Sequence, residues 1–287
     1  MPVGATELLG RACHEWNYSA RECRESIAVD SLAGTTTAHF LSKLAVDADG
    51  SPKAYHPLDK RPPDNHSVAF DWLANINVND LLGIQGENGA VGPNAGFHIS
   101  ATSLFDNRFP KNDTRRWVDA GEIPYIVLSG RSFPWPGGSV VRPGCLAFVV
   151  DTVSGHSTGA IYADVGRAVG EGSVALALRL GLRPFHPSRP PKVTGFSGKR
   201  FLYLILPNAR PSPPWSADQI HSAASGAFEA WGGEQQLLSI VPDLPPLKGP
   251  VTRQPLAMPE SAVPRHEIPD LEREGGRGND VSKFELD

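Results

Sequence analysis

The sequence has few cysteines and lacks the metal-binding patterns that cysteine and histidine usually form. Its 287 residues contain three cysteines, Cys13, Cys23 and Cys145, with no Cys-x-x-Cys pair. This odd count favours reduced thiols over a disulfide framework, although Cys13 and Cys23 could pair if the protein is exported. The nine histidines form no His-x-x-x-His pair or cluster with cysteine, which argues against a zinc site. We therefore predict no metal and no cofactor.

Long apolar runs and an excess of positive charge are also absent. No run of eighteen apolar residues occurs, so no membrane-spanning helix is expected. The formal net charge of −4 argues against a nucleic-acid partner. Near the N-terminus, Glu7 stands where a signal peptide would be apolar. From these features we expect a monomer without a nucleic-acid or membrane partner, cytoplasmic by sequence.

Two common catalytic motifs are missing. The chain has no Gly-x-x-x-x-Gly-Lys-Ser/Thr phosphate loop, and no Gly-x-Ser-x-Gly elbow surrounds Ser100, Thr102 or Ser103. The segment Asp47-Ala-Asp49-Gly50 begins like a calcium loop but lacks the downstream bidentate glutamate. A tight turn is therefore the preferred interpretation of that segment.

Short apolar runs separated by Gly, Pro and Asn turns dominate the middle of the chain. These runs are residues 39–46, 96–100, 123–128, 145–151, 158–163 and 201–206. Many short strands bounded by turns predict a mainly β protein, with a closed or sandwiched sheet. We expect three regions: an N-terminal arm or helix at 1–37, a folded domain at 38–241, which carries the resemblance and the catalytic residues described below, and a proline-rich, disordered tail at 242–287.

Capping signals predict two helices in the second half of the chain. Ser173 precedes the helix-forming segment 174–180, and Gly181 follows it. Ser216 starts a second helix, with an apolar face running from Ile220 to Trp231 and Gly232 at its end. Both signals are those of ordinary packing helices.

Two carboxylates lie on either side of a glycine-rich turn. Asp164 ends the run Ala-Ile-Tyr-Ala-Asp, and Glu171 stands between Gly170 and Gly172. A pair of this kind suits general acid and base chemistry, in which one carboxyl group donates a proton and the other holds a water molecule. An acidic residue near a helix start also commonly caps the helix or complements its dipole. Spacing alone does not separate the two interpretations.

The residues around the pair resemble family 75 glycoside hydrolases, the fungal-type chitosanases. The segments Ala-Ile-Tyr-Ala-Asp164-Val-Gly and Gly-Glu171-Gly-Ser-Val-Ala-Leu-Ala are the most specific part of this resemblance, which extends from about residue 38 to residue 233. Shorter similar blocks are Lys43-Leu-Ala-Val-Asp-Ala-Asp-Gly50, Ala54-Tyr-His-Pro57, Asp71-Trp-Leu-Ala-Asn75, His98-Ile-Ser-Ala-Thr-Ser-Leu104 and Tyr125-Ile-Val-Leu128.

The resemblance implies a fold, a reaction and a set of site residues. The expected fold is a six-stranded double-psi-like β-barrel with peripheral helices. The expected reaction is inverting, endo-acting cleavage of β-1,4 bonds in chitosan or a related amino-sugar polymer, in an extracellular setting. Asp164 and Glu171 are the expected catalytic residues. We assign Glu171 as acid and Asp164 as base, although the roles could be exchanged.

Other residues are expected to contact the substrate. The predicted substrate-binding residues are Asp47, Asp49, Tyr55, Ser100, Thr102 and Tyr162. Aspartate carboxylates can bind the ammonium group of an amino sugar. Tyr55, Trp72, Trp117 and Trp135 are further candidates for stacking on sugar rings, although most aromatic residues belong to the core. The alternative function is a non-catalytic carbohydrate-binding or toxin-associated module, because the loop between the acids is shorter than in the fungal enzymes.

Overall fold

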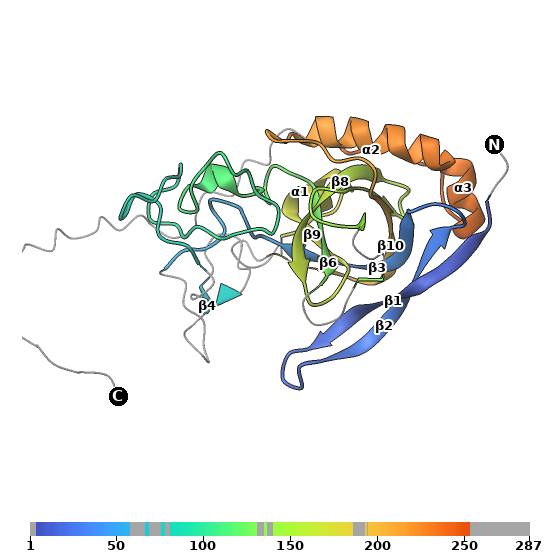
Figure 1. The fold of residues 1–287 in the computed structure, drawn as a ribbon, viewed down its shortest axis with the longest axis horizontal. Helices are drawn as coiled ribbons and strands as arrows, with labels where there is room; N and C mark the ends of the chain where they lie inside the picture. Colours follow the sequence, from blue (N-terminus) through green and yellow to red (C-terminus); the bar gives the residue numbers. More distant parts are fainter. Residues whose placement is uncertain are drawn as a thin grey trace, which may run out of the picture.

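The protein folds into a mainly β structure with a few helices at its periphery (Figure 1). The computed structural model describes residues 4–57, 81–130, 135–136, 140–185, 193 and 195–252, and the backbone of 67–68 and 76–77. The strands are β1 (Thr6–Asn17), β2 (Glu22–Leu32), β3 (Ala38–Asp47), β4 (Ser67–Val68), β5 (Ile76–Asn77), β6 (Tyr125–Ser129), β7 (Leu146–Asp151), β8 (Ser157–Gly166), β9 (Glu171–Ser173) and β10 (Phe196–Leu206). The helices are the 3-10 turn η2 (Thr114–Arg116), α1 (Val174–Arg179), α2 (Ala217–Trp231) and α3 (Gly233–Ile240).

Six strands close into a barrel. The main sheet has the order β1-β2-β3-β10-β7-β8-β6-β9, and β9 pairs back onto β3. The pairs β3–β9 and β6–β8 are parallel, whereas the other pairs in the barrel are antiparallel. The prediction of a mainly β, six-stranded, double-psi-like barrel with peripheral helices is confirmed.

Successive side chains of a strand point to opposite faces of the sheet, so the buried residues of the barrel form two groups. One set of side chains fills the barrel interior: Phe40, Leu44, Ile126, Leu128, Ala147, Val149, Ala160, Tyr162, Tyr203 and Ile205. The opposite set faces outward, and part of it is covered by α2, where the Phe148 and Phe228 rings stack at 4.3 Å. Figure 1 shows α2 and α3, in orange, lying along the outside of the barrel.

Both predicted helices are present with their predicted caps. The Ser173 hydroxyl accepts the N–H of Leu176 at the start of α1, and Gly181 follows the helix with a φ of +74°. The Ser216 hydroxyl accepts the N–H of Gln219 at the start of α2. The sequence interpretation missed α3, which begins directly after Gly232.

The N-terminal arm is a β-hairpin, so the helical alternative for this region is wrong. Strands β1 and β2 pair in antiparallel fashion over their whole length, and Figure 1 shows the hairpin extending beyond the barrel, in blue. Cys13 and Cys23 form a disulfide across it, which corrects the expectation of reduced thiols at these positions. The third cysteine, Cys145, is free and buried. At the other end of the hairpin, the Gln236 side-chain amide of α3 bonds both the N–H and the C=O of Gly4.

Two further sequence expectations need correction. Residues 96–100 do not form a strand, because His98 makes only an isolated bridge with Ile84. The sequence predicts a disordered tail from residue 242, but residues 242–252 pack on the barrel. Ser157 N–H donates to Lys248 O, and Val251 N–H donates to Arg179 O. Residues 253–287 lie outside the described residues. Within the described residues, no helix has the length and apolar character needed to cross a membrane.

Candidate functional site

Asp164 and Glu171 lie on the two strands that flank β6. Val127 of β6 pairs with Asp164 of β8 on one side and with Glu171 of β9 on the other. Paired residues of neighbouring strands project from the same face of a sheet, so both carboxylates share the outward face of Val127. Glu171 therefore lies in a short strand of the barrel, and not on the turn that the sequence suggested.

A β-bulge is what brings Asp164 to this face. Ile126 pairs with Tyr162, but the next residue, Val127, pairs with Asp164, so β8 contains one extra residue, Ala163. Without the bulge, Asp164 would share the face of Tyr162 and point into the barrel interior. Bulges commonly redirect side chains beside active sites.

Neutral hydrogen-bond donors hold the Asp164 carboxylate. The backbone N–H and the hydroxyl of Ser103 both donate to Asp164 Oδ1, at 2.8 and 2.7 Å. The same hydroxyl accepts the N–H of Val165, and Leu104 N–H donates to Ala163 O. The segment around Ser103 thus runs along the end of β8 and fixes the direction of the carboxylate.

Glu171 is held in a different way, between a glycine backbone and charged side chains of both signs. A Cβ on Gly166 would lie 3.2 Å from Glu171 Oε2, so only glycine lets the backbone approach the carboxylate this closely. Ala45 of β3 pairs with Glu171 of β9. Lys43, two residues before Ala45, forms an ion pair of 2.6 Å with Glu15. Burial and the negative charge of Asp47 raise the pKa of Glu171 to about 7, against the opposing effect of Lys43.

Asp47 and Asp49 complete the acidic cluster from the end of β3. Asp47 Oδ1 accepts the N–H of Asp49, which confirms the predicted tight turn. The Tyr55 hydroxyl donates to Asp49 Oδ1 at 2.7 Å, and the Tyr125 hydroxyl donates to the Asp49 carbonyl at 3.0 Å. Burial, then the charge of Asp164, raises the pKa of Asp47 to about 7. Burial and the neighbouring charges of Asp47 and Asp164 also raise the pKa of Asp49.

Three of these side chains could hold a cation. Oxygen atoms of Asp47, Asp49 and Asp164 lie within 4.8 Å of one another. Such a group of oxygens fits a hard metal ion, and it fits an ammonium group equally well. The absence of a metal requirement stays a prediction.

The remaining predicted substrate-binding residues occupy supporting positions. Ser100 is buried, and its hydroxyl accepts the N–H of Gly50. The buried Thr102 hydroxyl accepts the N–H of Val118 and donates to Leu104 O. Tyr162 is 4% exposed and lies inside the barrel. Direct substrate contact by these three side chains was predicted, but their burial makes them part of the framework behind the site.

The aromatic residues predicted to stack on sugar rings are also largely buried where the structure describes them. Tyr55 is 2% exposed and Trp117 is 9% exposed, with the indole N–H of Trp117 donating to Lys111 O. The Trp135 ring packs edge-on against Phe40 at 5.7 Å, and Trp72 lies outside the described residues. The sequence interpretation gave no role to Lys43, Ser103 or Tyr125. All three belong to the blocks of family resemblance, which was the one signal that could have identified them.

Comparison of the chain with protein-family models found no match, and a search of curated proteins found none either.

Proposed function

We propose that the protein is a glycoside hydrolase that cleaves β-1,4 bonds in chitosan or a related amino-sugar polymer, with inversion at the anomeric carbon. The observation that carries this proposal is the pairing of Asp164 and Glu171 on either side of Val127. Two strand spacings separate their backbones by roughly 10 Å. Inverting glycosidases place their carboxyl groups about 6.5–9.5 Å apart, whereas retaining enzymes place them about 5 Å apart. Carboxyl groups that project from backbones this far apart are compatible with the inverting arrangement, in which a water lies between them.

The surroundings of the two carboxyl groups support different roles. Glu171, with a pKa of about 7, retains a proton at mildly acidic pH and can donate it to the leaving-group oxygen. Asp164 Oδ1 accepts two hydrogen bonds from Ser103, which fix the direction of the carboxyl group. Its second oxygen can then orient the attacking water. The assignment of Glu171 as acid and Asp164 as base thus has a physical reason.

The acidic cluster supports an amino sugar as the substrate. The carboxylates of Asp47 and Asp49 lie beside Asp164, and bringing an ammonium group among them would relieve their mutual repulsion. The Cys13–Cys23 disulfide is compatible with an oxidising compartment, where such polymers occur.

The test is to incubate the protein with chitosan, chitin and peptidoglycan fragments and to measure new reducing ends. We expect release from chitosan, with the product anomer opposite to that of the substrate when observed by proton NMR. Glu171→Gln and Asp164→Asn should abolish release but retain polymer binding. Release of the retained anomer would refute the inverting mechanism. Binding without release by the unaltered protein, at any pH, would favour the non-catalytic carbohydrate-binding module.

A further inference from the structure

The tip of the β1–β2 hairpin presents an exposed aromatic ring close to Glu171. Tyr18 is 68% exposed. Arg167 directly follows Gly166, the residue whose backbone packs against the Glu171 carboxylate. The guanidinium carbon of Arg167 lies 5.3 Å from the centre of the Tyr18 ring and 5.9 Å from that of Trp16. Partial burial and the negative charge of Glu171 raise the pKa of Tyr18, and the charge of Arg167 lowers it, so both charged groups lie near the ring. The ring therefore borders the same site as Glu171.

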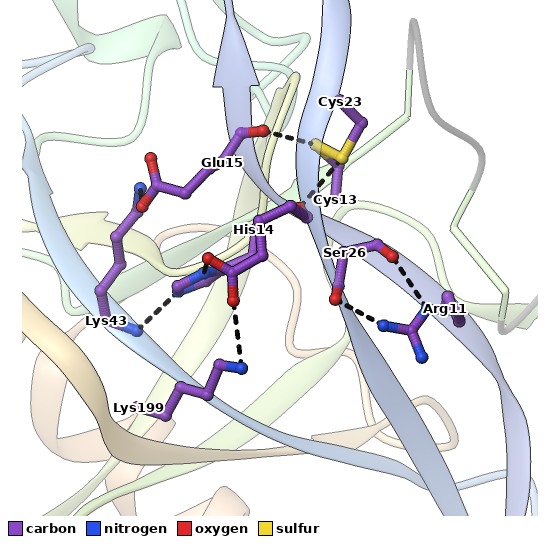
Figure 2. Close-up of polar contacts among 9 residues, drawn as sticks. Arg11, Cys13, His14, Glu15, Cys23, Ser26, Lys43 and Lys199 are labelled. Carbon is purple, nitrogen blue, oxygen red and sulfur yellow. Dashed lines mark hydrogen bonds and ion pairs between the residues drawn. A yellow bond between two sulfur atoms is a disulfide. The ribbon is translucent and has the colours of Figure 1, made fainter.

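The hairpin tip is held in place by several independent contacts. The Cys13–Cys23 disulfide joins the two strands just before the tip, and Figure 2 shows it among the surrounding polar contacts. Within the turn, Asn17 Oδ1 accepts the N–H groups of Ser19 and Ala20. The hairpin also contacts the loop that leads to Glu171, because Val169 N–H donates to Cys13 O at 2.8 Å.

Two ion pairs connect the hairpin to the barrel strands beneath it. Glu15 pairs with Lys43 of β3, and both residues are labelled in Figure 2. Lys199 of β10 pairs with the carboxylate of Glu25 at 3.1 Å. The Lys43 pair is short, at 2.6 Å, and the lysine side chain is only 20% exposed. The position of Tyr18 relative to Glu171 is therefore set by the folded structure, and an aromatic ring held in this way can bind a sugar without a large ordering cost.

The chemistry of this surface differs from that of the acidic cluster. The ring of Tyr18 offers an apolar face to the C–H groups of a pyranose ring. Arg167 is exposed, and among the residues that the structure describes it forms no ion pair. Its positive charge disfavours an ammonium group at this position, because unpaired like charges repel. The acidic cluster of Asp47, Asp49 and Asp164 has the opposite preference.

We propose that Tyr18 and Arg167 form a sugar-binding subsite beside Glu171 that selects a unit without positive charge, such as an N-acetylated one. An ammonium-bearing unit would bind on the opposite side, at the acidic cluster. The preferred substrate is then a partly N-acetylated amino-sugar polymer, which binds to two subsites of opposite charge. This inference rests on the proposed function only in taking an amino-sugar polymer as the ligand.

The test measures calorimetric binding of N-acetylglucosamine and glucosamine hexamers to the full chain carrying Glu171→Gln, which prevents turnover. Tyr18→Ala should weaken binding of the N-acetylated hexamer about tenfold, and Tyr18→Phe should preserve it because the stacking face remains. Leu8→Ala, which removes a side chain 65% exposed on β1 of the same hairpin, is the matched control and should change neither affinity. Arg167→Glu should shift the preference toward the glucosamine hexamer, whereas Arg24→Glu, at an exposed arginine of β2, should not.

The outcomes separate this inference from the proposed function. Unchanged affinities in both Tyr18→Ala and Arg167→Glu would overturn the subsite, even if the unaltered protein hydrolyses chitosan. Altered affinities without any hydrolysis by the unaltered protein would support the subsite and overturn the enzyme. If neither hexamer binds the Glu171→Gln chain, the subsite is wrong whatever the activity measurements give.

Discussion

The two carboxylates of the site share the acidic neighbour Asp47 but differ in their other partners. Asp164 is held by neutral donors from a single neighbouring segment, the backbone and hydroxyl of Ser103. Glu171 receives no hydrogen bond from Ser103; burial and the charge of Asp47 raise its pKa, whereas the charge of Lys43 lowers it. A bulge in β8 directs Asp164 toward the site. The β1–β2 hairpin, about 150 residues earlier in the chain, contacts the loop that leads to Glu171. Similar chemical groups can therefore be prepared for different tasks by what surrounds them.

The largest expected effect comes from removing each carboxylate separately. Glu171→Gln and Asp164→Asn should each lower kcat on chitosan oligomers by about 10²–10⁴-fold, since each removes a proton-transfer group. A dinitrophenyl glycoside, whose leaving group needs no protonation, should recover activity in Glu171→Gln but not in Asp164→Asn. Recovery in Asp164→Asn alone would exchange the roles of the two residues.

The next effect concerns stability and its dependence on pH. Asp47 has a pKa of about 7 when folded and about 3.9 when unfolded. The folded state therefore binds more protons between these values, and stability falls as pH rises through this window. Asp47→Asn should raise the free energy of unfolding by about 1–3 kcal/mol at pH 8 and have little effect at pH 4, as measured by urea denaturation. The exposed Asp243→Asn should show no such pH dependence. An equal effect of Asp47→Asn at both pH values would contradict the raised pKa.

A smaller effect is expected from Ser103. Ser103→Ala removes the hydroxyl that donates to Asp164 Oδ1 but leaves the backbone donor in place. We expect about a 10- to 100-fold loss in kcat with little change in KM, because one hydrogen bond to a charged group contributes about 1.5–3 kcal/mol. Ser154→Ala removes a comparable hydroxyl–carboxylate bond, to Asp151, away from the site, and should leave kcat unchanged. Equal losses in the two variants would show that Ser103 acts only through stability.

The smallest effect is expected on the Glu171 side, at Gly166. A methyl group there would lie 3.2 Å from Glu171 Oε2 and 3.0 Å from Val127 Cγ1, so the carboxylate must shift by a few tenths of an ångström. Gly166→Ala should lower kcat several-fold while the melting temperature stays within a few degrees. The control is Gly226→Ala in α2, where no atom lies within 4 Å of the new methyl group. Its activity should be unchanged, with stability equal or slightly higher. Full activity in Gly166→Ala would mean that Glu171 is not positioned by this contact.

The sequence predicted the elements whose signals are local. Turn-bounded apolar runs identified β3, β6, β7, β8 and β10, and capping residues identified α1 and α2. The hairpin was ambiguous because Glu7, Glu15 and Glu25 interrupt its alternation, and three-residue β9 is too short to have a periodicity. The amino-acid composition around Ala163 does not indicate a bulge, yet the bulge determines which face of the sheet carries Asp164. The pairing of Cys13 with Cys23 depends on hairpin register, which odd-count reasoning could not provide.

The Gln236–Gly4 contact has a consequence for how the molecule can be truncated. One side-chain amide forms both hydrogen bonds and joins positions 232 residues apart in the chain. The free end of β1 is thereby fastened to α3, while the other end of the same strand leads to the tip beside Glu171. A truncation that removes Gly4, or one that removes α3, would abolish both hydrogen bonds. Preparations that differ only in such handling could then differ in saccharide affinity, although every residue of the site is intact.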